Sequence, residues 1–155
     1  MPEGPYPPVA ELLPHAGRMV FLTDVVEHDE NGTACVAEIG EDAPFRGAGG
    51  LVPAWVGIEY MAQCIAAHGG LKARAEGRHV KVGFFVGSRR IDIYTAGFSP
   101  GQVLEVRAGH VMGTSGFFAF ACSVRDKASG ALLMEGHLNV FLSDDLRPVG
   151  QEPSE

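Results

Sequence analysis

A single long helical segment in the middle of the chain limits the folds open to it. We expect a helix from Trp55 to about Glu76, and its first part reads WVGIEYMAQCIAAHGGL. These residues are apolar on nearly every side rather than along one stripe, which is typical of a helix buried inside a domain. Pro53 is well placed at or just before a helical first turn, whereas Gly69 and Gly70 are expected to weaken or bend the helix.

Strand-like segments surround this helix. Residues 19–26 and 33–39 are rich in β-branched and aromatic residues and flank the turn sequence DENG, which predicts a hairpin. After the helix come VKVGFFVGSRRIDI, GQVLEVRAGHVM, GFFAFACSVRD and ALLMEGHLNVFL, and glycine-containing turns join the last three. This order predicts an α+β fold in which an antiparallel sheet wraps round one long central buried helix. We expect one domain over residues 1–144, beginning with an irregular arm, and a disordered tail at 145–155.

Charge and composition exclude several classes of protein. The formal net charge is -7, which argues against general nucleic-acid binding. No leader-like start and no apolar stretch long enough to span a bilayer is seen, so we expect a cytoplasmic protein. The widely spaced Cys35, Cys64 and Cys122 are expected to be reduced core residues. No metal-ligand or nucleotide-binding motif is present, so no metal or other cofactor is expected.

Glu59 is the one acid on the apolar part of the expected helix. At helical spacing it shares a face with Trp55, Ala62 and Ala66, and the opposite faces are apolar as well. Loss of water disfavours the charged form of a carboxylate, so such a glutamate can both take up and release a proton near neutral pH. The alternative is a glutamate that reaches water at the first turn, where the helix dipole favours an anion. We favour a catalytic role.

Two further features are expected near Glu59. The glycine-rich loop ending at Gly50 leads to the helix start at Ala54 and Trp55, whose backbone N–H groups suit a carbonyl oxygen that gains negative charge. Simple turn geometry also accounts for the glycines. Trp55 and Ala62 are candidates for the wall of a pocket, although such residues are commonly plain core.

Histidines and basic residues give two more hypotheses. His15 follows Leu-Leu-Pro in an apolar arm that could fold over the site, and we consider it a candidate catalytic residue. The other histidines are interpreted as surface or structural residues, with His28 in a turn and His68 on the opposite side of the helix from Glu59. A short stretch is locally basic on this acidic chain, which fits an acidic partner or simply a solvated face. Its basic residues are Lys72, Arg74, Arg78, Lys81, Arg89 and Arg90.

Three strings together resemble the β-hydroxyacyl-acyl carrier protein dehydratases, and their wording is most similar to the branch found with aryl polyene pigment synthesis. The strings are LLPHAGRMVFLTDVV, VPAWVGIEYMAQ and KVGFFVGSRRIDIYTAGFSPGQVLEV, and the likeness runs from about Leu12 to Leu142. The resemblance implies a hotdog fold, a homodimer or heterodimer of such subunits, and a substrate carried on acyl carrier protein. It also implies that Glu59 is the catalytic acid, that Ala54 and Trp55 offer a backbone N–H to the thioester carbonyl, and that the basic stretch docks the carrier.

One departure from the family concerns the loop before the helix. The dehydratases carry a glycine-histidine-phenylalanine-proline motif there, whereas this chain reads PFRGAGGLVPAW. Dehydration needs a base at the α-carbon and an acid at the departing hydroxyl, so His15 or a histidine from a partner subunit is the hypothesis for the second group. The resemblance favours dehydration of 3-hydroxyacyl-carrier protein to a trans-2-enoyl thioester in fatty-acid or polyene-type synthesis. Thioester hydrolysis and a non-catalytic partner subunit remain open.

Overall fold

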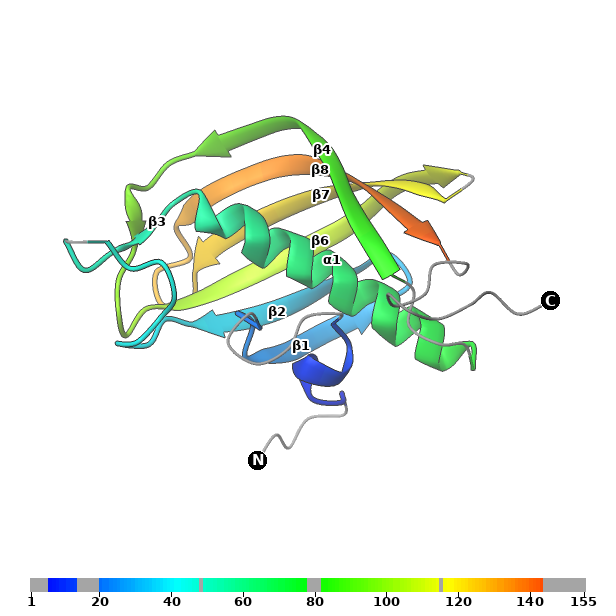
Figure 1. The fold of residues 1–155 in the computed structure, drawn as a ribbon, viewed down its shortest axis with the longest axis horizontal. Helices are drawn as coiled ribbons and strands as arrows, with labels where there is room; N and C mark the ends of the chain where they lie inside the picture. The colour runs from blue at the N-terminus through cyan, green and yellow to red at the C-terminus, as the bar shows by residue number, and fades with distance from the viewer. Residues whose placement is uncertain (1–5, 14–19, 48, 78–81, 115, 144–155) are drawn as a thin grey trace, which may run out of the picture.

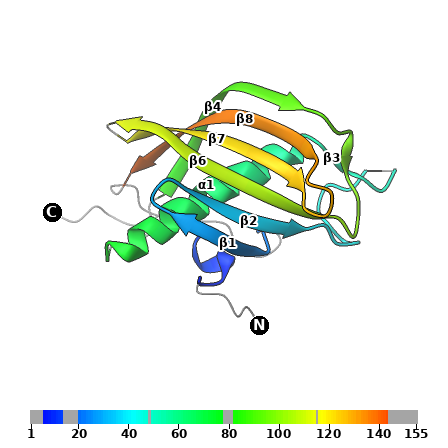
Figure 2. The same cartoon turned by 180° about the vertical axis from the view of Figure 1, so that it is seen from behind.

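The computed structural model describes residues 6–13, 20–47, 49–77, 82–114 and 116–143. One long helix, α1 (Val56–Ala75), lies against the inner face of a six-stranded antiparallel sheet that curves round it (Figure 1). Figure 2 shows the same sheet from behind, covering the helix. The predicted architecture is therefore confirmed, and the expected tail at 145–155 lies outside the described residues.

The sheet has the strand order β1-β2-β6-β7-β8-β4. Strand β4, which precedes β6, β7 and β8 in the chain, therefore lies at the edge opposite β1. The strands in that order are β1 (Asp24–Asp29), β2 (Gly32–Glu38), β6 (Val103–Thr114), β7 (Phe117–Asp126), β8 (Leu132–Ser143) and β4 (Val82–Ile93). A separate small pair joins β3 (Val52–Pro53) to β5 (Gly97–Phe98), and the arm holds one short 3-10 turn, η1 (Val9–Glu11). None of the helices in the described part of the chain is long and apolar enough to cross a membrane.

The first hairpin forms where the turn sequence predicts it, but its first strand is displaced. The carboxylate of Asp29 accepts the N–H groups of Asn31 at 2.7 Å and Gly32 at 3.0 Å, which fixes the turn. Strand β1 begins only at Asp24, so the prediction of a strand from residue 19 is wrong at its start. His28 consequently lies on β1 and not in a turn.

Pro53 lies just before the helix, as one of the two predicted placements allowed, and forms part of β3. It pairs with Gly97, and α1 starts three residues later with Trp55 at the cap position. The helix ends one residue before the predicted end and runs through both glycines without a break. Gly70 has a packing role, because a Cβ at this position would lie 2.8 Å from the carbonyl oxygen of Leu12.

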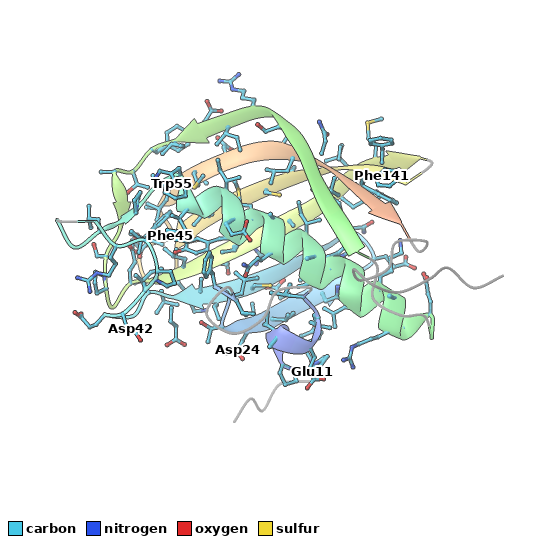
Figure 3. All side chains as sticks on the ribbon, in the orientation of Figure 1. Glu11, Asp24, Asp42, Phe45, Trp55 and Phe141 are labelled. Atoms are coloured by element: carbon cyan, nitrogen blue, oxygen red, sulfur yellow. The ribbon has the colours of Figure 1, made fainter. Side chains whose placement is uncertain are left out.

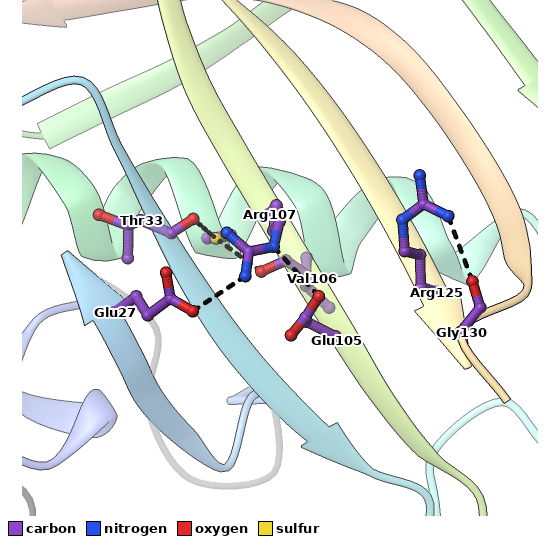
Figure 4. Close-up of polar contacts among 8 residues, drawn as sticks. Glu27, Thr33, Glu105, Val106, Arg107, Arg125 and Gly130 are labelled. Carbon is purple, nitrogen blue, oxygen red and sulfur yellow. Dashed lines mark hydrogen bonds and ion pairs between the residues drawn. The ribbon is translucent and has the colours of Figure 1, made fainter. Parts of the chain in front are cut away.

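Contacts between the helix and the sheet form the core. Met61, Cys64 and Ile65 on α1 are buried, and the Cys64 thiol approaches the carbonyl oxygens of Thr33 on β2 and Val106 on β6 (Figure 4). All three cysteines are free and buried, as expected. On the outer face of the sheet, the guanidinium of Arg107 on β6 binds Glu27 on β1 at 2.9 Å and Glu105 on β6 itself at 3.1 Å (Figure 4).

One side of α1 is left open by the sheet. Ile58, Glu59, Ala62, Ala66 and Gly69 are only half-buried, whereas the side of the helix that faces the sheet is buried. The helix is central, as expected, but on this side its own chain covers it only in part. An apolar pattern shows that a face is to be covered, but it does not show whether the same chain covers it.

Candidate functional site

Glu59 lies in the first turn of α1, on the side that the sheet leaves open. Its side chain is half-buried, and its Oε1 accepts a hydrogen bond of 3.1 Å from Nε2 of Gln63, one helical turn further along. Both features weighed from the sequence are therefore present, because the carboxylate has lost part of its water and also lies where the helix dipole favours an anion.

Gln63 fixes the surroundings of this carboxylate. The side chain is fully buried, and its Oε1 accepts the backbone N–H of Phe21 at 2.9 Å. Because an N–H group can only donate, this bond settles which end of the amide faces Glu59. Nε2 therefore points to Glu59 as a donor and holds its carboxyl group in place. Sequence reasoning did not select Gln63 as a site residue, although its spacing of four from Glu59 is the signal of a facing pair.

The helix start is arranged as a turn that leaves donors free. Gly57 and Ile58 donate their N–H groups to the carbonyl oxygens of Ala54 and Trp55, at 2.9 and 3.1 Å. The N–H groups of Trp55 and Val56 make no hydrogen bond to any described residue. Such donors lie one turn before Glu59, which fits the expectation that this region faces a carbonyl oxygen. Binding by Ala54 stays a prediction.

Gly50 closes the turn that precedes the helix. Its φ is 85°, its N–H donates to the Gly47 carbonyl at 2.9 Å, and its own carbonyl accepts Nε of Arg46 at 2.9 Å. The left-handed backbone accounts for a glycine here without a ligand. A substrate-binding role for Gly50 is a prediction that this geometry does not test.

An aromatic cluster stands beside the helix start. The ring centres of Phe45 and Trp55 lie 5.6 Å apart (Figure 3). The ring centres of Phe45 and Phe21 lie 6.0 Å apart. Phe21 in turn contacts the buried Tyr60 on α1. Phe45 was not among the residues selected from the sequence, and no local signal marks it, because its position depends on how the loop folds back onto the helix.

Two cavities open in the described part of the chain, and Glu59 lines neither. The first, of about 270 Å³, lies between the helix start and the end of β2. Its walls include Phe21, Val56 and Tyr60, with Glu38 and Asp42 among the lining residues. Burial raises the pKa of Tyr60 to about 12, so its hydroxyl keeps its proton at neutral pH. The second cavity, of about 550 Å³, lies over β1 and β2 near His28 and Thr33.

Three histidines gather on the side of α1 that faces the sheet, away from Glu59. The Thr33 hydroxyl bonds to Nδ1 of His28 at 2.7 Å and to Nδ1 of His68 at 2.8 Å. Burial, with the charges of His28, Lys72 and His110, lowers the pKa of His68 to about 4. His68 is therefore uncharged at neutral pH.

The expected docking residues and the expected second catalytic group are only partly described. Lys72 and Arg74 are exposed at the end of α1, and Arg74 is bound to Glu11 at 3.1 Å. Arg90 is exposed on β4 and bound to Asp92 at 2.8 Å. His15, Arg78 and Lys81 lie outside the described residues, as does the side chain of Arg89. Among the described residues, no group of three histidine, cysteine or acidic side chains is arranged to hold a metal ion.

Comparison with solved structures places this arrangement among hotdog proteins. The dehydratase heterocomplex ApeI:P from Xenorhabdus doucetiae matches with a TM-score of 0.83 and 27% identity, over 89% of this chain and 92% of that one. Two further matches share the fold alone. One is smu.793 from Streptococcus mutans UA159 bound to acetyl CoA, with a TM-score of 0.61 and 10% identity over 77% of this chain and 87% of that one. The other is the E. coli PaaI protein from the phenylacetic acid degradation operon, with a TM-score of 0.60 and 11% identity over 76% of this chain and 81% of that one.

The sequence itself matches one family model over most of its length. No curated protein sequence matches the chain. The model of the ApeP dehydratases, named ApeP-like, matches residues 7–151, which include every element of the sheet and the whole of α1. The chain is therefore a hotdog protein that belongs to the ApeP-like dehydratase family.

Proposed function

We propose that this chain dehydrates 3-hydroxyacyl thioesters carried on acyl carrier protein to trans-2-enoyl thioesters, with Glu59 as one of two acid–base groups. The observation that supports this best is the carboxylate of Glu59, half-buried on the open side of α1 and held by Gln63. Membership in a dehydratase family supports the reaction class.

The bond changes of this reaction define what the site has to do. A base takes a proton from C2, the electron pair of that bond forms the C2–C3 double bond, and the hydroxyl leaves C3 as water after gaining a proton. In our proposal Glu59 protonates the hydroxyl. The free N–H groups of Trp55 and Val56 bind the thioester oxygen, where negative charge builds up while the C2 proton leaves.

The second proton-transfer group is His15 or a histidine of a partner subunit. His15 itself lies outside the described residues, but the chain on both sides of it is anchored. Leu12 is buried against Gly70, and the N–H of Phe21 is held by Gln63 beside Glu59. The described residue before this segment and the one after it therefore both contact α1, the latter beside Glu59, and this supports His15 as a candidate.

A second hotdog subunit is the partner that we propose. The open side of α1 is lined by Ala62, Ala66 and Gly69, whose small side chains allow a second surface to approach closely. Strand β4 is twelve residues long and pairs only with β8 among the described strands, so one of its edges is available. The related ApeI:P structure is a heterocomplex, and a heterodimer would also bring the loop histidine that this chain lacks.

The decisive experiment measures two products with two proteins. The wild-type chain and Glu59→Gln are incubated with 3-hydroxyacyl-carrier protein, each alone and mixed with a homologous dehydratase. Enoyl absorbance reports dehydration, and free thiol reports hydrolysis. Glu30→Gln is the matched control, because Glu30 is an exposed acid in the turn between β1 and β2. We expect enoyl product from the wild type and the control, and a loss of at least about 100-fold in Glu59→Gln.

Other outcomes would change the proposal in defined ways. Equal turnover by wild type and Glu59→Gln would remove Glu59 from the chemistry. Release of free thiol without enoyl product would replace dehydration by thioester hydrolysis. Activity that appears only in the mixture, and is independent of Glu59, would make this chain a non-catalytic partner. Unchanged dehydration by His15→Ala would leave the partner subunit as the source of the second group.

Carrier docking has its own test at the end of α1. Lys72 and Arg74 are exposed there, and acyl carrier proteins are acidic, so charge reversal to glutamate at both positions should raise KM for carrier-bound substrate. The same variants should leave KM for a pantetheine-bound substrate unchanged, because that substrate lacks the acidic protein. An equal effect on both substrates would argue against docking at this surface.

A further inference from the structure

We infer that Phe45 and Trp55 together bind the pantetheine arm that joins the acyl group to its carrier, so that this protein recognises a thioester by its arm. The inference rests on the proposed function, because it takes the thioester to lie at the start of α1. Phe45 is the new residue in it, and its role follows from direction along the helix, exposure and backbone conformation.

The direction of the substrate along α1 places the arm beside these rings. In the proposed function the N–H groups of Trp55 and Val56 bind the thioester oxygen, and the reacting carbons lie at Glu59. Glu59 follows Trp55 by four residues on one face of α1, so the acyl chain runs from the helix start toward Ala62. The sulfur is bonded to the other side of the carbonyl carbon, so the arm leaves in the opposite direction. It therefore passes the N-terminal end of the helix, toward which the side chain of Trp55 leans (Figure 3).

Both rings are exposed to an unusual degree. The exposed fraction is 49% for Phe45 and 57% for Trp55, and the ring centres lie 5.6 Å apart. Two adjacent large apolar side chains left in water form a patch, and such patches commonly mark a surface that binds something. Burial within the described part of the chain does not account for them.

The backbone of Phe45 also indicates a role for its ring. Its φ of 68° is the one positive value found for a described residue other than glycine. A bulky side chain is disfavoured in this region, where glycine is at ease. Residues held in such conformations cluster at binding and active sites. The sequence therefore retains a phenylalanine ring at a position where the backbone alone would favour glycine.

The loop that carries Phe45 is braced, so the ring is held in place before a ligand arrives. The Arg46 guanidinium binds the carbonyl oxygens of Glu41 and Gly50. The N–H of Gly47 donates to the Leu51 carbonyl at 2.9 Å, which ties the end of the loop to the start of β3. A preformed surface binds a ligand without first having to order its own side chains.

The pantetheine arm has the chemistry that such a pair of rings binds. Beyond the sulfur it is a neutral chain of methylene groups and two planar amides, followed by a branched apolar carbon. Methylene groups and amide planes pack against aromatic faces, and the indole N–H of Trp55 can donate to an amide carbonyl. Glu41 and Asp42 on the loop of Phe45 are exposed acids, which disfavour a phosphate group at the rings and suit the neutral arm.

The far end of the arm is attached to the carrier protein, and one of the basic residues expected to dock it lies at this end of the domain. Met134 on β8 lies against Gly57 in the first turn of α1, and β8 pairs there with the end of β4. Arg90 is exposed on this part of β4. Lys72 and Arg74 instead lie about 25 Å from the start of α1, so a carrier docked at these two residues would deliver its acyl group to the site of a partner subunit.

Three thioesters of one saturated four-carbon acyl group serve as probes, because without a hydroxyl they cannot be dehydrated. Their thiol parts are ethanethiol, N-acetylcysteamine and pantetheine, which carry no amide, one amide and two amides. The chain contains a single tryptophan, so emission titrations report contact with Trp55 and give Kd values. We expect Kd to fall as the arm lengthens, with the largest change of emission for the pantetheine thioester.

The variants separate the ring from the backbone. Phe45→Gly removes the ring and relieves the positive φ, so we expect a protein at least as stable as wild type that binds the pantetheine thioester about 10-fold more weakly. Its Kd for the ethanethiol thioester should equal that of wild type. An eight-carbon acyl group on pantetheine should be weakened by the same factor as the four-carbon group, because the acyl chain runs away from the rings.

Two further variants complete the set. Trp55→Ala keeps the backbone N–H but should lose the same dependence on the arm, measured by calorimetry. Phe117→Ala is the matched control, because Phe117 on β7 is also an exposed ring, at 52%, paired with another phenylalanine. It should bind all probes as wild type does.

Four results would overturn the inference. They are an unchanged Kd for the pantetheine thioester in Phe45→Gly, an equal loss for the ethanethiol thioester, a loss that grows with acyl length, and a changed oligomeric mass of the variants with unchanged dependence on the arm. The last would make the patch a subunit contact. If Glu59→Gln turns substrate over normally while the dependence on the arm persists, the proposed reaction fails and the arm contact stands. If turnover depends on Glu59 but Phe45→Gly binds every probe as wild type does, the arm contact fails and the reaction stands.

Discussion

Gln63 and Glu59 face each other on α1 across a hydrogen bond of 3.1 Å, and Gln63 can act only as the donor. Its acceptor oxygen is occupied by the N–H of Phe21, from a segment 42 residues away in the sequence. The position of the carboxylate is thus tied to the arm of the chain through one buried amide.

This link predicts the effects of two substitutions of Gln63. Gln63→Leu should lower the free energy of unfolding by about 1–3 kcal/mol, because the N–H of Phe21 loses its acceptor, and should also reduce turnover. Gln63→Glu keeps an acceptor for Phe21 but no longer donates to Glu59. It also buries a second acid beside Glu59, so it should lower the free energy of unfolding by about 3 kcal/mol or more at neutral pH and also lose turnover. Denaturant unfolding and the enoyl assay check both, and equal turnover by Gln63→Glu and wild type would limit Gln63 to a structural role.

Close packing of the arm on the helix predicts the effect of Gly70→Ala. Alanine in the interior of a helix is normally more stable than glycine by about 1 kcal/mol. Here its Cβ would lie 2.8 Å from the backbone oxygen of Leu12, which cannot move without shifting the arm. We therefore expect a loss of about 1–3 kcal/mol in the free energy of unfolding, with faster proteolysis of the arm. A gain in stability would contradict this packing.

Acid sensitivity is predicted from His68. Its pKa in the folded protein is about 4, below the ordinary value of 6.5. As the pH falls below 6.5 the unfolded chain takes up a proton that the folded protein does not, so stability present above this pH is lost progressively down to about pH 4.

The full shift corresponds to about 3 kcal/mol, and we expect about 2 kcal/mol because the neighbouring His28 is only half-buried and lets water screen the site. The charged or titratable groups around the ring are His28, Asp29, Lys72 and His110. Unfolding free energies between pH 8 and pH 4 measure the effect, and His68→Leu should flatten this part of the profile. The same slope in His68→Leu would assign the acid sensitivity to other groups.

An unpaired histidine nitrogen offers a stabilising substitution. Nε2 of His110 on β6 is buried and has no hydrogen-bond partner among the described residues, and its ring packs between Phe118 and Phe120. Replacing a buried polar atom without a partner by an apolar group removes its desolvation penalty. His110→Leu should therefore raise the free energy of unfolding by about 1 kcal/mol. Thermal and denaturant unfolding measure this, and a destabilised variant would show that the nitrogen has a partner in solution.

Local signals in the sequence were sufficient for the helix and for most strands, and they also made Glu59 the candidate site residue. The helix bounds agree to within one residue at each end, because the apolar run is long and a polar segment follows it. Glu59 stands out because a carboxylate within such an apolar run loses water at a cost in free energy, which a plain core residue would avoid. The turn at Asp29 follows equally from the side chains that form it.

Features that depend on contacts between distant segments were decided by the tertiary structure. Pro53 enters a strand because Gly97 lies opposite it, and Gly70 is needed because Leu12 crosses the helix there. The open side of α1, the bond from Gln63 to Phe21 and the positive φ of Phe45 likewise have no local signature. Residue types and periodicity report how a segment prefers to fold, whereas partners and exposure depend on which surfaces the complete chain brings together.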